Sequence, residues 1–317
     1  MHYLKQKPID FITHSIACHC LTMIYDIGLL DAFLDKTHVS LNEIKKNYNF
    51  NCVVSALKTL EKSGIVCFYE NSVRITSFGK GVAEHIGLIK IFFTGYRNLI
   101  QQGAQIALSE KEPTYDSIDG KAIAHAATLI SEKMIDPLLI DEVLAVNIPG
   151  TICDLGCGEA KMLSKVCSIS GNTGLGIEIN AEVITSIRKK LSRDVQVETG
   201  DVSKLDGIWE DVTMLVQCHV FHDFDGPNEC LKIINSTLEH FPNLRYFFYI
   251  DTVAAETGND EIFPGFDYVH GLLDISPRTY SETISMFEES DYQVMKEVKI
   301  TSLPRTFLWV LTPKMKK

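Results

Sequence analysis

The second half of the chain alternates between short apolar runs and longer amphipathic segments. The apolar runs predict strands at 150–155, 174–178, 195–198, 212–217, 245–251, 294–300 and 306–312. Apolar residues at helical spacing predict helices at 160–168, 181–191, 226–240 and 279–290. Strands that alternate with helices form a parallel sheet covered on both faces. The last two strands are joined by a short turn, so we expect an antiparallel hairpin at the end of the sheet.

The first half of the chain is predominantly helical by pattern. Residues 9–36 carry apolar side chains at helical spacing, and so do most of residues 89–145, apart from a looser stretch at 103–120. A helix is expected to resume at 121 and to continue to 146.

Two shorter helices and a hairpin lie between these segments. Ser40 and Glu43 have the spacing of a capping box, which predicts the start of a helix. A second helix covers 53–63, and strand-like runs follow at 65–69 and 73–76. This order is typical of a winged helix. The sequence therefore predicts a helical winged-helix domain at 1–100, a helical connector at 101–146 and an α/β domain at 147–317.

Composition narrows the possible classes of protein. Apolar residues make up 45% of the 317 residues, yet no uninterrupted apolar run is long enough to span a membrane. The nine cysteines include no C-x-x-C pair, which favours free thiols and a cytoplasmic protein. The formal net charge of −11 argues against nucleic acid as a partner, because binding to phosphates requires a basic face.

A glycine turn follows the first strand of the α/β domain. Asp154 lies next to the end of that strand, and Gly156 and Gly158 follow within Asp-Leu-Gly-Cys-Gly. Glycine has no Cβ, so such a turn lets a ligand approach the backbone closely. Glu178 ends the second strand, at the distance where nucleotide-binding βαβ units place a carboxylate against a ribose. Asp201 follows the third strand.

This series of motifs resembles the class I S-adenosylmethionine (SAM) dependent methyltransferases. The nicotinamide pattern fits less well, because Lys161 stands where its third glycine would be. The resemblance implies a Rossmann-like seven-stranded sheet, with Glu178 on the ribose and Asp201 beside the adenine. A doubly wound fold that binds another nucleotide, or none, is the alternative. The residues expected to bind SAM are Asp154, Gly156, Gly158, Glu178, Asp201, Val202 and Gln217.

The N-terminal domain has two interpretations. A winged helix can bind DNA, but the helix at 53–63 has only two lysines and no arginine for base edges. The resemblance to small-molecule O-methyltransferases implies instead a domain that forms a homodimer and covers the substrate pocket. A non-catalytic SAM-binding regulator is a further alternative, against which the intact acidic and histidine motifs argue.

His222 and Asp223 follow the fourth strand, where ligands bind in an open α/β sheet. They resemble the His-Asp motif of the O-methyltransferases, which implies that His222 is a general base. Asp251, at the end of the fifth strand, could hold the other imidazole nitrogen. His219 is interpreted as structural.

A second histidine, His270, lies in Phe-Asp-Tyr-Val-His-Gly after the fifth strand. This segment and His222-Asp223 together resemble the metal-dependent 2-oxo acid C-methyltransferases, such as the phenylpyruvate and 2-ketoarginine enzymes of nonribosomal-peptide precursor pathways. The resemblance implies that His222 and His270 hold Fe(II) or another divalent metal. The expected reaction is methylation at C3 of a 2-oxo acid through a metal-stabilised enolate. Asp223 is either a third ligand or orients a bound water. The group that removes the C3 proton is unassigned, with a metal-bound hydroxide and Asp223 as candidates.

Two questions about the substrate stay open. A metal-free O-methyltransferase, with His222 as base and Asp251 as its partner, is the alternative reaction. A 2-oxo acid also requires a cation for its carboxylate, for which Arg97 is the first candidate and Arg278 and Arg305 compete. The other residues expected to line the substrate pocket are Tyr96, Phe224, Phe266 and Tyr268.

Overall fold

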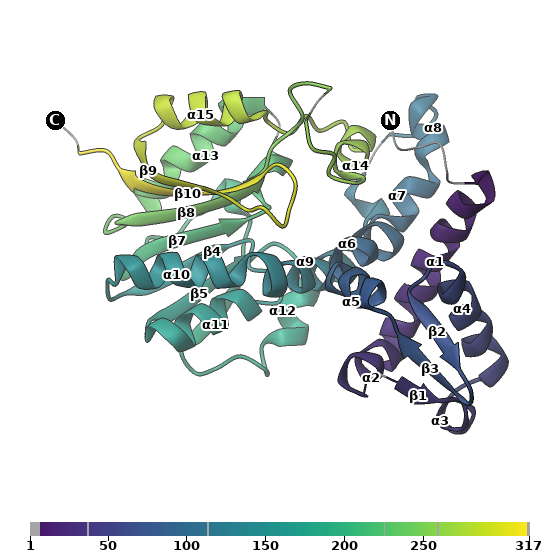
Figure 1. Ribbon diagram of the computed structural model, residues 1–317. Helices are drawn as coiled ribbons and strands as arrows, with labels where there is room; N and C mark the ends of the chain where they lie inside the picture. Colours follow the sequence, from purple (N-terminus) through teal and green to yellow (C-terminus); the bar gives the residue numbers. More distant parts are fainter. Residues whose placement is uncertain (1–6, 37, 113, 225, 259, 316–317) are drawn as a thin grey trace. The chain divides into compact units, whose positions relative to one another are not determined.

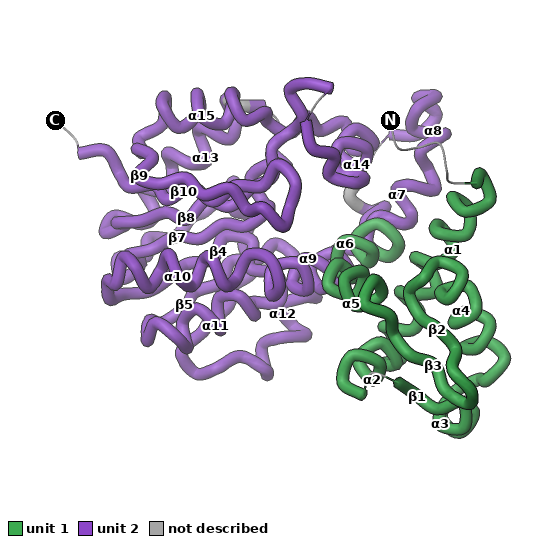
Figure 2. The backbone as a smooth tube through the Cα atoms, viewed as in Figure 1, with its two compact units in different colours: residues 1–94 green, residues 95–317 purple. Residues whose placement is uncertain are grey.

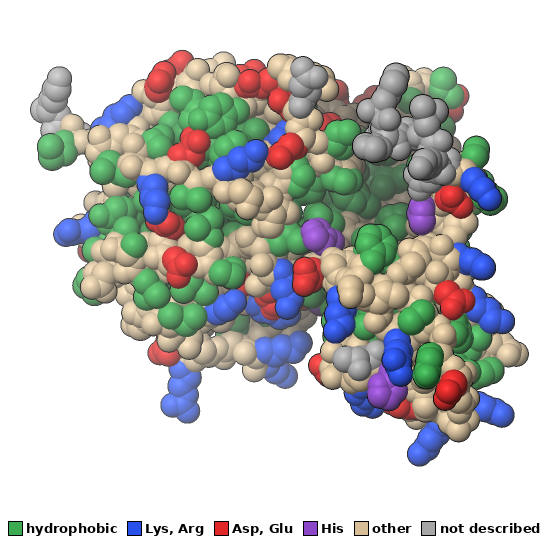
Figure 3. Space-filling view, viewed as in Figure 1, with side chains coloured by type: hydrophobic (Ala, Val, Ile, Leu, Met, Phe, Trp, Pro, Cys, Tyr) green, Lys and Arg blue, Asp and Glu red, His purple; other side chains and the backbone are tan. Residues whose placement is uncertain are grey.

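The computed structural model describes residues 7–36, 38–112, 114–224, 226–258 and 260–315. The chain forms two compact units that meet between Thr94 and Gly95 (Figure 2). The boundary therefore falls before residue 100, and the segment expected as a separate connector, 101–146, is part of the second unit. On the face drawn in Figure 3, acidic and basic side chains are interspersed.

Unit 1 combines helices with a small antiparallel sheet. Ser40 accepts a hydrogen bond from the backbone N–H of Glu43, so the predicted helix start is correct. The short strand at 38–40 was not predicted, and it pairs with the second strand of the predicted hairpin. The elements are α1 (Pro8–Asp26), α2 (Leu29–Lys36), β1 (His38–Ser40), α3 (Leu41–Asn47), α4 (Phe50–Lys62), β2 (Val66–Tyr69), β3 (Ser72–Ile75), α5 (Ser77–Glu84) and α6 (Ile86–Lys90).

Four helices open unit 2. They are α7 (Arg97–Gln101), α8 (Gly103–Ala107), α9 (Gly120–Met134) and α10 (Asp136–Val146). The prediction of one helix over 121–146 is wrong, because the helix breaks at Ile135. Pro137 lies in the first turn of α10, and proline has no N–H to continue the hydrogen bonds of a preceding helix.

The seven predicted strands of unit 2 form one sheet. They are β4 (Thr151–Leu155), β5 (Thr173–Glu178), β6 (Val195–Thr199), β7 (Val212–Cys218), β8 (Tyr246–Thr252), β9 (Tyr292–Lys299) and β10 (Thr306–Pro313). Their order is β6-β5-β4-β7-β8-β10-β9 (Figure 1). Strands β4 to β8 pair in parallel, and β10 is antiparallel to both β8 and β9, which confirms the terminal hairpin.

Helices cover this sheet in two groups (Figure 1). α10, α11 (Lys161–Ser170) and α12 (Ala181–Ile187) lie beside the β4–β6 half, and α13 (Gly226–His240) and α15 (Tyr280–Glu289) lie beside the other half. The predicted helix at 181–191 is therefore shorter than expected. α14 (Phe266–Leu272) carries the segment with the second candidate histidine.

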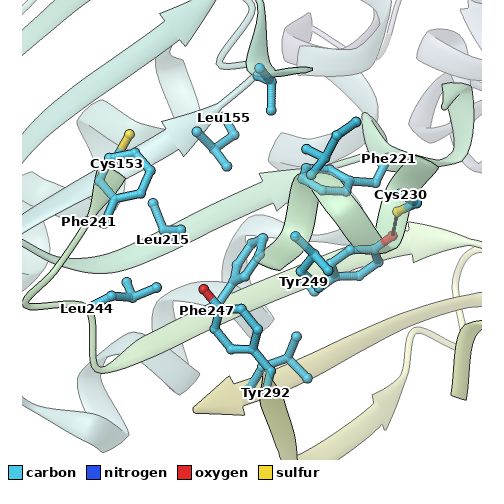
Figure 4. Close-up of a cluster of buried hydrophobic side chains, with 14 of the residues drawn as sticks. Cys153, Leu155, Leu215, Phe221, Cys230, Phe241, Leu244, Phe247, Tyr249 and Tyr292 are labelled. Atoms are coloured by element: carbon cyan, nitrogen blue, oxygen red, sulfur yellow. Dashed lines mark hydrogen bonds between the residues drawn. The ribbon is translucent and has the colours of Figure 1, made fainter. Parts of the chain in front are cut away.

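A cluster of aromatic side chains fills the core between β7, β8 and α15 (Figure 4). Tyr249 is fully buried and its ring lies 5.4 Å from that of Phe221, 5.1 Å from Phe287 and 5.9 Å from Trp309. Phe221 begins the short helix that follows β7, so the core fixes the first residue of the predicted catalytic turn.

In the part of the chain that the structure describes, no single helix is long and apolar enough to cross a membrane. Helices α1 and α2 together have the length and composition of a span, but the pair is bent by 83°.

Candidate active site

The strand order reverses beside β4, where the chain runs toward β5 on one side and β7 on the other. Ligands of open α/β sheets bind at such a point, beyond the carboxyl ends of the strands. Gly156 follows β4 with φ of 80°, and a Cβ added there would lie 2.3 Å from Cγ2 of Val220. The turn therefore requires glycine for both its backbone conformation and its close contact with the β7 loop.

Glu178 lies at the end of β5 and is tied to this turn. One carboxylate oxygen accepts a hydrogen bond from the N–H of Gly158 at 2.9 Å, and the other accepts from the N–H of Asn180 at 2.8 Å. A carboxylate can accept about four hydrogen bonds, so it retains capacity for two ribose hydroxyls.

Asp201 follows β6 and lies partly exposed. Its Oδ1 accepts from the N–H and the hydroxyl of Ser203, and these bonds, with the nearby Lys204 ammonium, hold the pKa of Asp201 below its usual value. Val202 is buried in the following 3-10 turn.

Two further residues predicted to bind the cofactor, Asp154 and Gln217, are buried. Asp154 is 2% exposed, and burial, with the charges of Glu178 and Asp136, raises its pKa to about 8. Gln217 is fully buried; its amide nitrogen donates to the carbonyl of Ile250, and its amide oxygen accepts from the N–H of Val220. In this structure the Gln217 side chain joins β8 to the loop after β7.

His222 lies in the 3-10 turn Phe221–Asp223 and is 7% exposed. Its Nδ1–H donates to Oδ1 of Asp251 at 2.5 Å. Burial lowers the pKa of His222, but the charges of Asp251 and Asp223 outweigh it, so the pKa lies above the usual value. Burial likewise raises the pKa of Asp251, and His222 reverses that effect and holds it below the usual value. The hydrogen bond to Asp251 fixes the orientation of the ring, so that Nε2 of His222 lies 3.7 Å from Oδ1 of Asp223.

His270 is 2% exposed, and its ring centroid lies 5.0 Å from that of His222. Its Nδ1–H donates to the carbonyl of Phe266 at 2.7 Å, one turn earlier in α14. Nε2 of His270 is buried and makes no hydrogen bond to any described residue. Because Nδ1 carries the proton, Nε2 presents a free lone pair.

Asp223 connects the two histidines. Its Oδ1 lies 3.7 Å from Nε2 of His222 and 3.4 Å from Nε2 of His270. One ligand atom from each of the three residues lies within 4.8 Å of the others. The sequence predicted each of these residues, and the structure brings them together from two segments.

His219, interpreted as structural, lies outside this group. Its Nε2 is 3.1 Å from the hydroxyl of Thr252, which in turn lies 2.8 Å from that of Thr306. Burial is the main cause that lowers the pKa of His219 to about 4, so the ring is neutral at physiological pH.

The predicted pocket aromatics differ in their relation to the histidines. Phe266 is 6% exposed, and its ring lies 5.3 Å from that of His222 and 4.3 Å from that of His270. Phe224 packs on Phe221, whereas Tyr268 is 54% exposed on α14. Tyr96 is partly buried just before α7, which packs against α14.

The three candidate arginines have different surroundings. Arg278 and Arg305 are buried, and each binds other groups of the protein. Arg278 donates hydrogen bonds to backbone carbonyls, and Arg305 donates two to the carboxylate of Asp267. Arg97, at the start of α7, is exposed. No pattern in the sequence indicates these contacts of Arg278 and Arg305, because their partners lie far away along the chain.

The chain is similar to known methyltransferases. Residues 153–240 match the model of the methyltransferase domain. The chain is 27% identical over 326 residues to indolepyruvate C-methyltransferase of Streptomyces griseus, covering 98% of this chain and 95% of the relative. Solved structures with the same fold include human N-acetylserotonin methyltransferase in complex with SAM (TM-score 0.71, 13% identity, all of both chains) and mitomycin 7-O-methyltransferase (TM-score 0.65, 13% identity, 96% of both chains).

The chain is a class I SAM-dependent methyltransferase. The prediction of an enzyme with a Rossmann-like sheet is thereby confirmed, and SAM is its methyl donor. The glycine turn, Glu178 and Asp201 lie where this fold binds its cofactor.

We expect Glu178→Gln to weaken the binding of the cofactor. The change keeps the shape of the side chain but removes the charge that strengthens its hydrogen bonds to the ribose. A hydrogen bond to a charged group contributes about 1.5–3 kcal/mol, so affinity should fall about 10-fold or more. Calorimetry with S-adenosylhomocysteine measures this, and Glu182→Gln, an exposed carboxylate on α12, is the control. Equal affinities for both variants would contradict the assigned role.

Proposed function

We propose that this methyltransferase transfers the methyl group to C3 of a 2-oxo acid with the help of a divalent metal held by His222, Asp223 and His270. The observation that carries the proposal is the state of the two imidazoles. Each Nδ1 donates to an oxygen of the protein, so both Nε2 atoms offer lone pairs, and that of His270 is buried without a hydrogen-bond partner among the described residues.

The donor set fits such a metal. Two imidazoles and one carboxylate with open positions are the ligands of non-haem Fe(II) sites. Histidine ligands usually donate their second ring N–H to a carboxylate or a backbone carbonyl, which fixes the orientation of the ring. Asp251 and the carbonyl of Phe266 are such acceptors here. The chemistry of the three side chains therefore supports the proposal without selecting among Fe(II) and similar cations.

The reaction explains why a metal is useful. A carbon next to a ketone is a weak acid, and a divalent cation, when bound, would stabilise the enolate of a bound 2-oxo acid as a Lewis acid. The residues of the chain contribute orientation and shielding: Asp251 fixes the ring of His222, and Phe266 packs against both imidazoles and excludes water from them. The enolate forms when a base, for which Asp223 is the candidate on this chain, takes the C3 proton. The enolate carbon then attacks the sulfonium methyl of SAM, the bond between that methyl and sulfur breaks, and S-adenosylhomocysteine leaves.

The proposed substrate class is supported by the name of the relative and by the surroundings of the three candidate arginines. The relative is named for the C-methylation of indolepyruvate, an aromatic 2-oxo acid. The similarity to it extends over 98% of this chain and 95% of the relative. Of the three candidate arginines, Arg278 and Arg305 already hold protein groups. We assign the substrate carboxylate to Arg97, since it is exposed, forms no ion pair with a described acidic residue, and begins α7, which packs against α14.

Product analysis with SAM carrying a deuterated methyl group tests the proposal. Indole-3-pyruvate, phenylpyruvate and simple phenols serve as acceptors, each with and without a metal chelator. The proposal predicts a label at C3 of a 2-oxo acid, loss of product with chelator, and recovery on addition of Fe(II). Methylation of phenols alone, insensitive to chelator, would contradict it.

That contrary outcome corresponds to the alternative reaction, a metal-independent O-methyltransferase. The 2.5 Å contact of His222 with Asp251 favours it, because a carboxylate that orients an imidazole also makes it a better general base. In that reaction His222 removes a hydroxyl proton, and His270 serves only as part of the pocket wall.

We further propose that the chain forms a homodimer through unit 1. Three isoleucines one helical turn apart, Ile9, Ile12 and Ile16, are between 50% and 61% exposed on α1, on a face other than that of the buried Leu21. A continuous apolar stripe of this kind is typical of a protein interface.

We expect Ile12→Lys to convert a dimer into a monomer. Burying one isoleucine contributes about 1.5–3 kcal/mol, so a lysine in the interface should weaken association by about 10-fold or more. Light scattering coupled to gel filtration measures the mass. Ile208→Lys is the control, because Ile208 is 68% exposed in unit 2. A wild-type monomer, or a dimer unaffected by Ile12→Lys, would refute this interface.

A further inference from the structure

Arg278 is a buried cation whose donors point at the catalytic turn. Its side chain is 3% exposed, and no ion pair with a described acid accompanies it. Nη2 donates to the carbonyl of Phe221 at 2.6 Å and to the hydroxyl of Tyr249 at 3.2 Å, and Nη1 donates to the carbonyl of Phe224 at 3.3 Å. The two carbonyls belong to the residues directly before and directly after His222-Asp223.

We propose that Arg278 is a positioning residue that fixes the backbone of the His222-Asp223 turn relative to Asp251. The turn has little support of its own, because it is a three-residue 3-10 helix. Its backbone bonds from Asp223 N–H to the Val220 carbonyl and from Phe224 N–H to the Phe221 carbonyl are both 3.3 Å long. The contact from Arg278 to the Phe221 carbonyl is shorter, at 2.6 Å, and both of its contacts to the turn come from a charged donor. Charge-assisted hydrogen bonds are the stronger kind.

Arg278 is itself held by the strand that carries Asp251. The N–H of Ala254, just beyond β8, donates to the carbonyl of Arg278 at 2.8 Å, and Ala254 forms a bridge with Thr279. The hydroxyl of Tyr249, on β8, accepts a hydrogen bond from Nη2 of Arg278. One residue thus ties the turn of His222 to the strand of Asp251, and the 2.5 Å contact between them depends on that alignment.

The shape of the guanidinium makes Arg278 difficult to replace. Its planar fork reaches the two carbonyls from two different nitrogens, and one of these also reaches the Tyr249 hydroxyl, whereas the ammonium of lysine is a single point charge. Arg278→Lys keeps the buried charge and most of the volume. We therefore expect this variant to lose the positioning of the turn but to keep most of the stability of the core.

Hydrogen exchange measured by mass spectrometry tests this in the whole chain, with neither substrate nor metal present. In Arg278→Lys we expect exchange at residues 219–224 to be about 10-fold faster, with β8 and α15 unchanged, because local opening is governed by the contacts of the segment itself. Tyr249→Phe removes one acceptor and leaves both carbonyl contacts, so its exchange should match the wild type. Unchanged exchange in Arg278→Lys, or acceleration spread equally over β8 and α15, would overturn the proposal.

Steady-state kinetics with indole-3-pyruvate and SAM give the functional readout. A misplaced turn should lower kcat about 10- to 100-fold and leave the KM for SAM within about twofold, because reacting groups must be aligned closely while the cofactor residues are untouched. Equal losses in kcat and in SAM affinity would show a general defect and overturn the assignment. Since Arg278 serves the turn in either reaction, a wild type that methylates only phenols would refute the metal proposal alone, and the same split in kcat would be measured on that phenol.

Discussion

Replacing His270 with alanine should abolish both metal binding and turnover of a 2-oxo acid. His270 contributes one of two imidazole nitrogens, and its Nε2 has no hydrogen-bond partner among the described residues to replace the metal. Loss of a group that only orients a metal ligand lowers metal affinity or activity about 10- to 100-fold. Loss of a ligand itself should therefore lower kcat at least about 100-fold. Elemental analysis and the C3-methylation assay measure the two effects on one preparation.

His219→Asn is the matched control for this variant. His219 is also a histidine of this region, but its ring contacts Thr252 and it lies outside the group of three candidate ligands. Its backbone has φ of 57°, a conformation that asparagine tolerates. The control should keep its metal and its activity. If His270→Ala behaves like His219→Asn, His270 is not a ligand and the alternative reaction gains support.

Asp251→Asn should lower kcat about 10- to 100-fold while the protein stays folded, because the carboxylate orients His222 from behind. The variant keeps the shape of the side chain but removes the charge that raises the pKa of His222 against the opposing effect of burial. The imidazole then becomes both a weaker ligand and a weaker base, so the loss is expected in either reaction.

Asp274→Asn controls for a general effect of this substitution. Asp274 is an exposed carboxylate just after α14 and has φ of 58°, which asparagine also adopts. Initial rates at saturating SAM should be unchanged in this variant. A rate in Asp251→Asn within about twofold of the wild type would show that the 2.5 Å contact does not support catalysis.

The fold of unit 2 was largely predictable, because central strands such as β4 and β8 are buried and read as continuous apolar runs. β5, for example, was expected at 174–178 and is found at 173–178. The break at Ile135 was missed, since the apolar pattern continues through it and only Pro137 marks it. β1 was missed because three residues are too few to establish an alternating pattern.

The site was predictable where its residues end strands. Glu178 is the last residue of β5, Asp251 is the second-last residue of β8, and His222 follows β7 closely. Parallel strands bring their carboxyl ends to one edge. The position of His270 was predicted only through the resemblance of its segment. The contacts of Arg278 could not be predicted, because its acceptors lie at separations of 54 and 57 residues and backbone carbonyls leave no mark in a sequence.

The metal content of the untagged wild-type protein tests the central claim most directly. After anaerobic reconstitution with Fe(II) and removal of excess metal, elemental analysis should find about one transition-metal ion per chain, as expected for one set of three ligands. No retained metal under these conditions would contradict the account and would leave His222 and Asp251 as the base of an O-methyltransferase.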